Sequence, residues 1–501
     1  MSQPLLVAPG VALEPTSIPV PVGELRSRDL REQLRNATNY ASWAQAAQAL
    51  DQRSGRTAWK ERDVSALYDY ATLRTRLDQL RELRAAGDTR GLVFAIEEGI
   101  HGNLGGMGKP VLYSKARFGT KQLITDFVNA TVEALLHIES LPDSEMPLAS
   151  KLDLFRRASH CYGRSALMFS AGGTLMYFHF GVAKAMLEQG VLPSVLSGSS
   201  AGAITVGILG CHTDAELEGF FTAENIRFGE EWHPNWFERS TGLRRMFRAS
   251  SFEPTFDRLI PDLTFREAFE RSGRHISISV SPCERHHSPR LLNAMTSPHV
   301  LIRSAVRASC AIPGLFEPVQ LMARNATGQT VPYLPSRWID GVFAADLPAK
   351  QLARLYGVNH YVVSMINPML LPIFRDRKLQ SARLQPIFSI AKGSIRAALK
   401  SADVYIGKYL PASSLGVVNK VAHDLLSQSY VGDISIAPER RLFSPLRLLS
   451  PFTYDEIQAL ILAGERQTWP RIEMIRNSSI ISRTLEGILS RLDHLHTAVR
   501  D

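Results

Sequence analysis

The chain is poor in cysteine, and this scarcity excludes several classes of protein. It has four cysteines in 501 residues, and no two of them form a C-x-x-C pair. Few, scattered cysteines favour a reducing compartment and argue against a disulfide framework or a zinc site. Cys161, Cys211 and Cys310 lie among apolar or small residues, so we expect them to be core thiols.

We also expect neither a secretory signal nor a membrane-spanning segment from this sequence. The first 25 residues are rich in proline and lack a basic stretch followed by an apolar one, so they predict a flexible arm and no secretory signal. The longest uncharged stretch, residues 189–212, has the length of a membrane span. Because it contains Pro193 and several glycines and serines, it predicts a buried strand, turn and helix instead.

The composition is that of a globular protein with a basic excess. Hydrophobic residues make up 45% and charged residues 21% of a chain long enough for two or three domains. Lysine and arginine number 57 against 48 acidic residues, which gives a net charge of +9. Such an excess suits an anionic membrane surface. No nucleic-acid-binding motif is present, so we expect a lipid surface as partner and no nucleic acid.

Two patterns divide the chain. Residues 26–160 are mostly helical in pattern, with apolar residues at three- and four-residue spacing. The apolar residues expected to be buried there include Leu73, Leu77, Leu80, Leu83, Val128, Val132, Leu135 and Leu136. From residue 164 onward, short apolar segments alternate with helices and predict strands at 165–170, 194–197, 275–281 and 360–366. This alternation predicts an α/β fold whose mainly parallel sheet has helices on both faces.

One motif carries chemistry. Residues 198–202 read Gly-Ser-Ser-Ala-Gly, between an apolar strand pattern and a helix of small residues. This G-x-S-x-G turn presents its central side chain at a helix N-terminus, so Ser200 is a candidate acyl-transfer nucleophile. Gly198 and Gly202 are the flanking glycines that such a tight turn needs.

Two further motifs strengthen this interpretation. Residues 170–174 read Ser-Ala-Gly-Gly-Thr between a strand and a helix that is predicted to end at Gly190. The backbone N–H groups of Gly172 and Gly173 can therefore form an oxyanion hole. Residues 338–341 read Trp-Ile-Asp-Gly, and Asp340 at the end of this apolar segment can accept the proton of Ser200.

The order of these three motifs resembles the patatin-like acyl hydrolases, which use a Ser-Asp dyad. Residues 309–318, Ser-Cys-Ala-Ile-Pro-Gly-Leu-Phe-Glu-Pro, also resemble the stretch that precedes the patatin aspartate. The resemblance implies Ser200 as nucleophile, Asp340 as base, Gly172 and Gly173 as oxyanion donors, and no metal or cofactor. The chain departs from the family pattern at Thr174, where many members have a third glycine, and at residue 342.

Motifs upstream and downstream narrow the resemblance. Residues 101–110 and 119–124, and later 358–368, 431–434 and 466–470, are similar to the triacylglycerol lipases of yeast lipid droplets and plant oil bodies. This resemblance implies a patatin-like three-layer fold and four regions. They are an arm (1–25), a helical lipase-associated domain (26–160), a catalytic domain (161–370) and a helical C-terminal region (371–501).

The implied function is lipid ester hydrolysis, with triacylglycerol as first substrate and phospholipid as second. The implied location is cytoplasmic and peripheral, on a membrane or lipid droplet. Residues 375–410 hold eight basic residues beside an apolar stripe. Such a helix either lies in a membrane interface or packs on the core.

Other interpretations stay open. An acyltransferase or transacylase could use the same dyad, and a non-catalytic lipid-binding protein could retain it. An α/β-hydrolase triad would need a histidine after the aspartate, where His360 and His423 are available. The glycine-rich residues 101–109 resemble a phosphate loop, but Asn103 and Pro110 occupy two of its defining positions, so we expect a structural loop.

Overall fold

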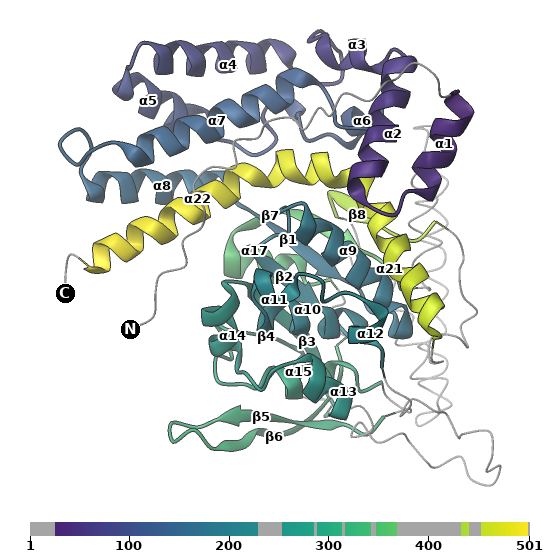
Figure 1. Ribbon diagram of the computed structural model, residues 1–501. Coiled ribbons are helices and arrows are strands. Elements are labelled where there is room, and N and C mark those ends of the chain that lie inside the picture. The colour runs from purple at the N-terminus through teal and green to yellow at the C-terminus, as the bar shows by residue number, and fades with distance from the viewer. Residues whose placement is uncertain are drawn as a thin grey trace, which may run out of the picture.

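The computed structural model describes residues 26–228, 253–284, 288–312, 316–341, 347–367, 432–439 and 452–498. The arm at 1–25, the basic helix at 375–410 and His423 lie outside the described residues. Figure 1 shows a helical layer above a sheet with helices on both of its faces. Among the described residues, no helix is both long and apolar enough to span a bilayer.

The N-terminal region is helical, as its pattern predicted. Its elements are α1 (Ser27–Asn36), α2 (Tyr40–Arg53), α3 (Arg56–Glu61), α4 (Tyr70–Ala85), α5 (Thr89–Gly99), η1 (Leu104–Gly106), α6 (Pro110–Tyr113), α7 (Gln122–Ser140) and α8 (Leu148–Tyr162). The predicted leucine stripe of α4 is buried at Leu73, Leu77 and Leu80. The prediction fails at Leu136 of α7, which is 43% exposed because it lies on the outer side of that helix.

The glycine-rich residues 101–109 form a structural turn. The Asn103 side chain accepts a hydrogen bond from the Gly108 N–H at 2.7 Å. Gly105 packs against Asp69 and Leu73 at the start of α4, at a positive φ of 57°. The backbone here is therefore folded onto its own domain.

The central sheet has eight strands. They are β1 (Arg164–Phe169), β2 (Val195–Gly198), β3 (His275–Pro282), β4 (Arg290–Asn293), β5 (Val319–Arg324), β6 (Thr330–Asp340), β7 (Val358–Ser364) and β8 (Ile434–Ile436). Their order is β5-β6-β3-β2-β1-β7-β8, with β4 paired to β3. Strands β3, β2, β1, β7 and β8 run parallel to one another. Strands β4, β5 and β6 form an antiparallel end of the sheet next to β3. The four predicted strands are confirmed within two residues.

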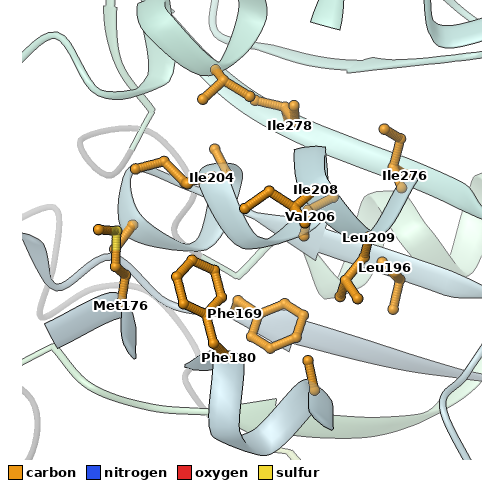
Figure 2. Close-up of a cluster of buried hydrophobic side chains, with 14 of the residues drawn as sticks. Phe169, Met176, Phe180, Leu196, Ile204, Val206, Ile208, Leu209, Ile276 and Ile278 are labelled. Carbon is orange, nitrogen blue, oxygen red and sulfur yellow. The ribbon is translucent and has the colours of Figure 1, made fainter. Parts of the chain in front are cut away.

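Helices cover both faces of this sheet. The elements that follow the strands are η2 (Gly173–Leu175), α9 (Met176–Glu188), α10 (Ala201–Cys211), α11 (Asp214–Leu217), α12 (Ala223–Ile226), α13 (Glu253–Leu259), α14 (Phe265–Ser272), α15 (Ile302–Ser309) and α17 (Ala349–Tyr356). Leu167 and Phe169 of β1 face the core formed with α9, α10 and α15, whereas Ala166 and Met168 face α17. Both sides of β1 are therefore apolar, as expected for a parallel strand buried on two faces. Figure 2 shows α10 packed between Ile276 and Ile278 of β3 and the aromatic rings of Phe169 and Phe180.

The C-terminal elements join the two parts of the molecule. They are β8, α21 (Tyr454–Thr468), η6 (Trp469–Arg471) and α22 (Ile472–Ala498). Ile475 of α22 belongs to the core of the sheet domain, and Leu485 belongs to the core of the N-terminal helices. Glu486 accepts a hydrogen bond from Ser194 at 2.7 Å and pairs with Arg164 at 3.3 Å. Since β8 lies within the predicted C-terminal region, the sheet continues beyond residue 370.

Helices α9 and α21 are in backbone contact. A Cβ atom at Gly181 would collide with the Ile461 carbonyl oxygen, and a Cβ atom at Gly464 would collide with the Phe178 carbonyl oxygen. These two glycines let the helices approach more closely than larger residues permit. The contact fixes α9, which follows directly after residues 170–175.

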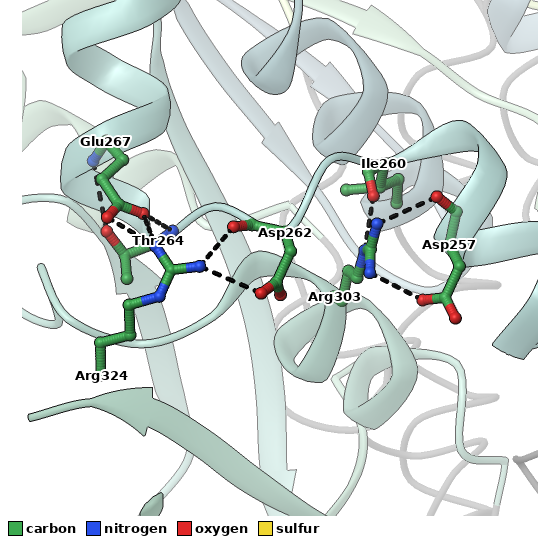
Figure 3. A network of polar contacts seen from close by, with 7 residues as sticks. All are labelled: Asp257, Ile260, Asp262, Thr264, Glu267, Arg303 and Arg324. Atoms are coloured by element: carbon green, nitrogen blue, oxygen red, sulfur yellow. Dashed lines mark hydrogen bonds and ion pairs between the residues drawn. The ribbon is translucent and has the colours of Figure 1, made fainter. Parts of the chain in front are cut away.

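Two arginines fix the antiparallel end of the sheet (Figure 3). Arg324 of β5 donates to the Glu267 carboxylate of α14 at 2.6 and 2.7 Å and to the Asp262 carbonyl at 2.7 Å. Arg303 of α15 donates to the Ile260 carbonyl at 2.5 Å and pairs with Asp257 at 2.9 Å. Both contacts hold α15 and β5 against the preceding helices.

Gly464→Ala should destabilise the protein strongly, because its methyl group has no room against the α9 backbone. We expect a loss of about 2 kcal/mol or more in the free energy of unfolding, measured by denaturant titration. Gly487→Ala in α22 is the matched control, since its Cβ would meet only the flexible end of Arg491. The control should be neutral or more stable by up to about 1 kcal/mol. Equal effects of the two variants would contradict a tight helix contact.

The Glu267 contacts should make part of the stability depend on pH. Burial opposes ionisation of this carboxyl, but the Thr264 N–H and the Arg324 guanidinium hold its pKa below the usual value. A lowered folded-state pKa adds stability at neutral pH that is lost as the pH falls through it. Glu267→Gln should therefore lower Tm at pH 7, and the difference from wild type should shrink below about pH 4. A constant difference at all pH values would contradict this ionic contribution.

Candidate active site

Ser200 lies at a sharp turn between β2 and α10. Its φ is 51° and its ψ is −117°, and among the described residues only Asn103 shares a positive φ without being glycine. Such a conformation costs on the order of 1–3 kcal/mol and is typical of functional sites. The predicted strand, turn and helix are confirmed, and Ser200 stands immediately before the first helical residue.

The flanking glycines are required by close packing. A Cβ atom at Gly198 would collide with the Gly202 carbonyl group, and one at Gly202 would collide with the Phe169 carbonyl oxygen. The first turn of α10 therefore rests on the ends of both β1 and β2. This packing explains why the motif has glycine at both positions.

The C-terminal end of α15 holds the backbone of this turn. The Ser200 N–H donates to Ser309 Oγ at 3.0 Å, and the Ser309 hydroxyl donates to the Ser279 carbonyl of β3 at 2.8 Å. The Cys310 thiol lies 3.5 Å from the Ser200 carbonyl oxygen. One residue further, the Ala311 carbonyl accepts the N–H of Asp340 at 3.0 Å. Residues 309–311 therefore contact the backbones of both candidate dyad residues.

Asp340 is the last residue of β6 and lies at the same end of the sheet as Ser200. It pairs with Val280 of β3, while Gly198 of β2 pairs with Ile278 of the same strand. Directly opposed residues of an antiparallel pair point to the same face. Val280 belongs to the core formed with α10 and α15, so the Asp340 side chain lies on the α10 side of the sheet, where it is 1% exposed.

The electrostatics of Cys310 agree with this placement. Burial raises the pKa of its thiol well above the usual value, and the negative charge of Asp340 raises it further. Cys310 is therefore close to Asp340 as well as to Ser200. Of the three predicted core thiols, Cys211 is fully buried, Cys310 is partly buried, and Cys161 is exposed on the outer side of α8, so the expectation for Cys161 was wrong.

Gly172 and Gly173 lie in the turn between β1 and α9, beside the turn of Ser200. Phe169 at the end of β1 pairs with Gly198 at the end of β2, so the two turns begin side by side. Gly173 has a φ of 58°, and a Cβ atom at Gly172 would collide with Ile366. Within the described part of the chain, neither glycine N–H donates a hydrogen bond to the protein.

One buried residue of this region has no signal in the sequence. His179 of α9 is fully buried and contacts the Ser170 carbonyl and Ser364 Oγ at 2.8 and 2.7 Å. Burial lowers the pKa of its imidazole to about 3. A histidine inside an apolar helix pattern gave no reason to connect it with the glycine loop.

The histidine offered for a triad lies elsewhere. His360 of β7 contacts Ser165 Oγ near the start of β1 at 3.0 Å. The opposite end of β1, at Phe169, lies about 13 Å further along the strand, and Ser200 follows the end of the neighbouring β2 beside it. His360 and Ser200 are therefore not brought together, and His423 lies outside the described residues.

The fold and the turn define an α/β protein with a serine at a nucleophile elbow. Residues 167–353 match the patatin-like phospholipase family, and residues 23–160 match a domain of unknown function, DUF3336. The chain is 31% identical to triacylglycerol lipase SDP1L of Arabidopsis thaliana, over 95% of its own length and 60% of that protein. It is 32% identical to triacylglycerol lipase 4 of Saccharomyces cerevisiae, over 89% and 51% respectively.

A patatin-like phospholipase domain-containing protein of Neosartorya fischeri is 30% identical, over 89% of this chain and 67% of that protein. The chain belongs to the patatin-like phospholipase family, as its motifs predicted. It spans about half to two thirds of the length of these curated relatives. The predicted domain boundaries, 26–160, 161–370 and 371–501, stay predictions.

Backbone strain at Ser200 can be measured without any assumption about function. Because glycine adopts a positive φ without steric cost, Ser200→Gly should be more stable than Ser200→Ala by about 1 kcal/mol. The measurement is denaturant unfolding of both variants under identical conditions. A more stable alanine variant would contradict a strained backbone at this position, since alanine is favoured wherever no strain exists.

Proposed function

We propose that this protein is a serine acyl hydrolase that cleaves fatty-acyl esters of lipids, with triacylglycerol as its first substrate and phospholipid as its second. One observation carries the proposal. A strained serine at the end of β2 and a buried aspartate at the end of β6 are held by three consecutive residues, 309–311. The names of the relatives SDP1L and triacylglycerol lipase 4 support the choice of substrate.

The first half of the reaction forms an acyl-enzyme. Ser200 Oγ attacks the ester carbonyl carbon while the Asp340 carboxylate accepts the hydroxyl proton. The carbonyl oxygen becomes an oxyanion, and the N–H groups of Gly172 and Gly173 donate hydrogen bonds to it. Collapse of this intermediate breaks the ester C–O bond, and the leaving alkoxide takes the proton from Asp340.

The second half releases the fatty acid. Asp340 accepts a proton from a water molecule, which attacks the acyl carbonyl within the same oxyanion hole. Collapse breaks the bond to Ser200, whose oxygen regains the proton. The dyad needs no metal or organic cofactor, because its base is a carboxylate and its electrophilic groups are backbone amides.

The site lies at the carboxyl ends of β1 and β2, where open α/β sheets usually bind their ligands. A lipid substrate must reach this edge from an aggregate such as a membrane or a lipid droplet. We therefore place the protein in the cytoplasm, associated peripherally with such a surface. Flotation of the full chain with triolein droplets or anionic vesicles tests this association, and recovery only in the unbound fraction would contradict it.

Ser200→Ala and Asp340→Asn should each lower the hydrolysis of triolein by at least about 10³-fold, because both halves of the reaction need both groups. The assay is lipid chromatography of released fatty acid, with phosphatidylcholine vesicles in parallel. Ser272→Ala, at the C-terminal end of α14, is the matched control and should keep wild-type activity, because the Ser272 hydroxyl contacts the Ala268 carbonyl and the Arg274 N–H of its own segment. Comparable Tm values establish that the variants are folded.

Two outcomes would contradict the proposal. Full activity of folded Ser200→Ala would exclude the serine mechanism. Transfer of the acyl group to added diacylglycerol or lysolipid, without free fatty acid, would favour an acyltransferase on the same dyad. Labelling of Ser200 by a fluorophosphonate would separate either enzyme from a non-catalytic lipid-binding protein.

A further inference from the structure

A buried histidine holds the loop that carries the two candidate oxyanion donors. His179 lies in the first turn and a half of α9 and has no exposed surface. Its Nε2 is 2.8 Å from the Ser170 carbonyl oxygen, and its Nδ1 is 2.7 Å from Ser364 Oγ. The ring is packed edge-on against Phe169, with a centroid distance of 5.1 Å.

The partners fix the tautomer. A carbonyl oxygen can only accept a hydrogen bond, so Nε2 carries the proton and donates to Ser170. Nδ1 is then the acceptor and receives the hydroxyl proton of Ser364. In the neutral imidazole, each ring nitrogen therefore has a hydrogen-bond partner. These two partners, Ser170 and Ser364, lie at the ends of β1 and β7.

Ser170 is tied on its other side to β7. Its N–H donates to the Ser364 carbonyl at 3.1 Å, and its hydroxyl accepts the N–H of Ile366 at 2.9 Å. Ile366 is also the residue against which Gly172 packs. The backbone of residues 170–173 is therefore held between β7 on one side and His179 of α9 on the other.

The chemistry of His179 separates it from a catalytic base. Burial lowers the pKa of the imidazole to about 3, so the ring stays neutral at any pH at which an esterase is assayed. Its one proton is already donated to a backbone carbonyl. The ring can orient the loop, but it has neither a free proton nor a free lone pair for a substrate.

We propose that His179 is a positioning residue, which sets the direction of the Gly172 and Gly173 N–H groups by anchoring the Ser170 carbonyl and Ser364. This inference rests on the proposed function, because it assigns those N–H groups to the oxyanion hole. Loss of the anchor should weaken binding of the oxyanion more than binding of the ground-state ester.

The test compares His179→Phe, which keeps the ring volume and removes both hydrogen bonds, with His179→Gln, whose amide can donate to Ser170. For a short-chain soluble ester, His179→Phe should lower kcat by about 10- to 100-fold, a large part of the effect of losing one oxyanion donor. KM should change less than about threefold. The inhibition constant of a trifluoromethyl ketone, which forms an oxyanion on Ser200, should rise by the same factor as kcat/KM falls.

Three further measurements separate positioning from a general loss of structure. His179→Gln should recover part of kcat, and Ser364→Ala should lower kcat less than His179→Phe does. The pH profile of kcat should keep its shape in every variant, since the ring does not titrate in the assay range. His212→Phe is the matched control, because His212 also bonds a backbone carbonyl, that of Ile208 at 2.8 Å, but at the far end of α10.

The outcomes are decisive either way. Wild-type kcat and wild-type inhibitor affinity in folded His179→Phe would overturn the inference. Changes in kcat and KM in the control His212→Phe that equal those in His179→Phe would overturn it as well. If His179→Phe does not fold, unchanged inhibitor affinity in both His179→Gln and Ser364→Ala overturns it. If Ser200→Ala stays active, the proposed function fails. If Ser200→Ala is inactive while the His179 variants keep kcat, only the positioning role fails.

Discussion

The backbone contact between the first turn of α10 and the ends of β1 and β2 is the constraint on which the site depends. Gly202 rests on the Phe169 carbonyl group, and Gly198 rests on Gly202. Between these two closely packed glycines, Ser200 takes a positive φ of 51°. The cost of that conformation, on the order of 1–3 kcal/mol, is met by the surrounding packing. The serine hydroxyl is consequently presented by rigid elements and not by a loop.

A second close contact extends this rigidity to parts of the chain that supply no candidate site residue. Gly181 and Gly464 bring α9 and α21 into backbone contact, and α9 follows directly after the oxyanion loop. Helix α22 then packs against the N-terminal helices through Leu485 and Ile488. The position of Gly172 therefore depends on helices near the end of the sequence as well as on β1. This dependence gives a physical reason for the N-terminal helices and the sheet domain to occur in one chain.

The sequence predicted those features that local chemistry determines. Strands β1, β2 and β7 contain short apolar segments, β3 alternates isoleucine and valine with serine, and the turn at Ser200 follows from glycine spacing. Strands β4, β5, β6 and β8 were not predicted. Strands β4 and β8 have only four and three residues, and β5 and β6 join the sheet through the pairing of β6 with the distant β3. Helix periodicity located α7 but could not tell that Leu136 faces outward, since that depends on which neighbours pack against the helix. His179 gave no signal because its role is defined by Ser170 and Ser364, which belong to two other elements.

The glycine of the Asp340-Gly341 pair has a structural explanation that the sequence does not reveal. Such pairs are common in turns, where the glycine provides a positive φ. Gly341 is needed for a different reason, because a Cβ atom there would collide with the carbonyl oxygen of Ser279 on β3. The same carbonyl accepts the hydroxyl proton of Ser309, which in turn accepts the N–H of Ser200. A side chain at residue 341 would therefore separate β6 from β3 and disturb both candidate dyad residues through one carbonyl group. The two motifs are 140 residues apart in sequence, yet this single backbone group makes the geometry of each depend on the other.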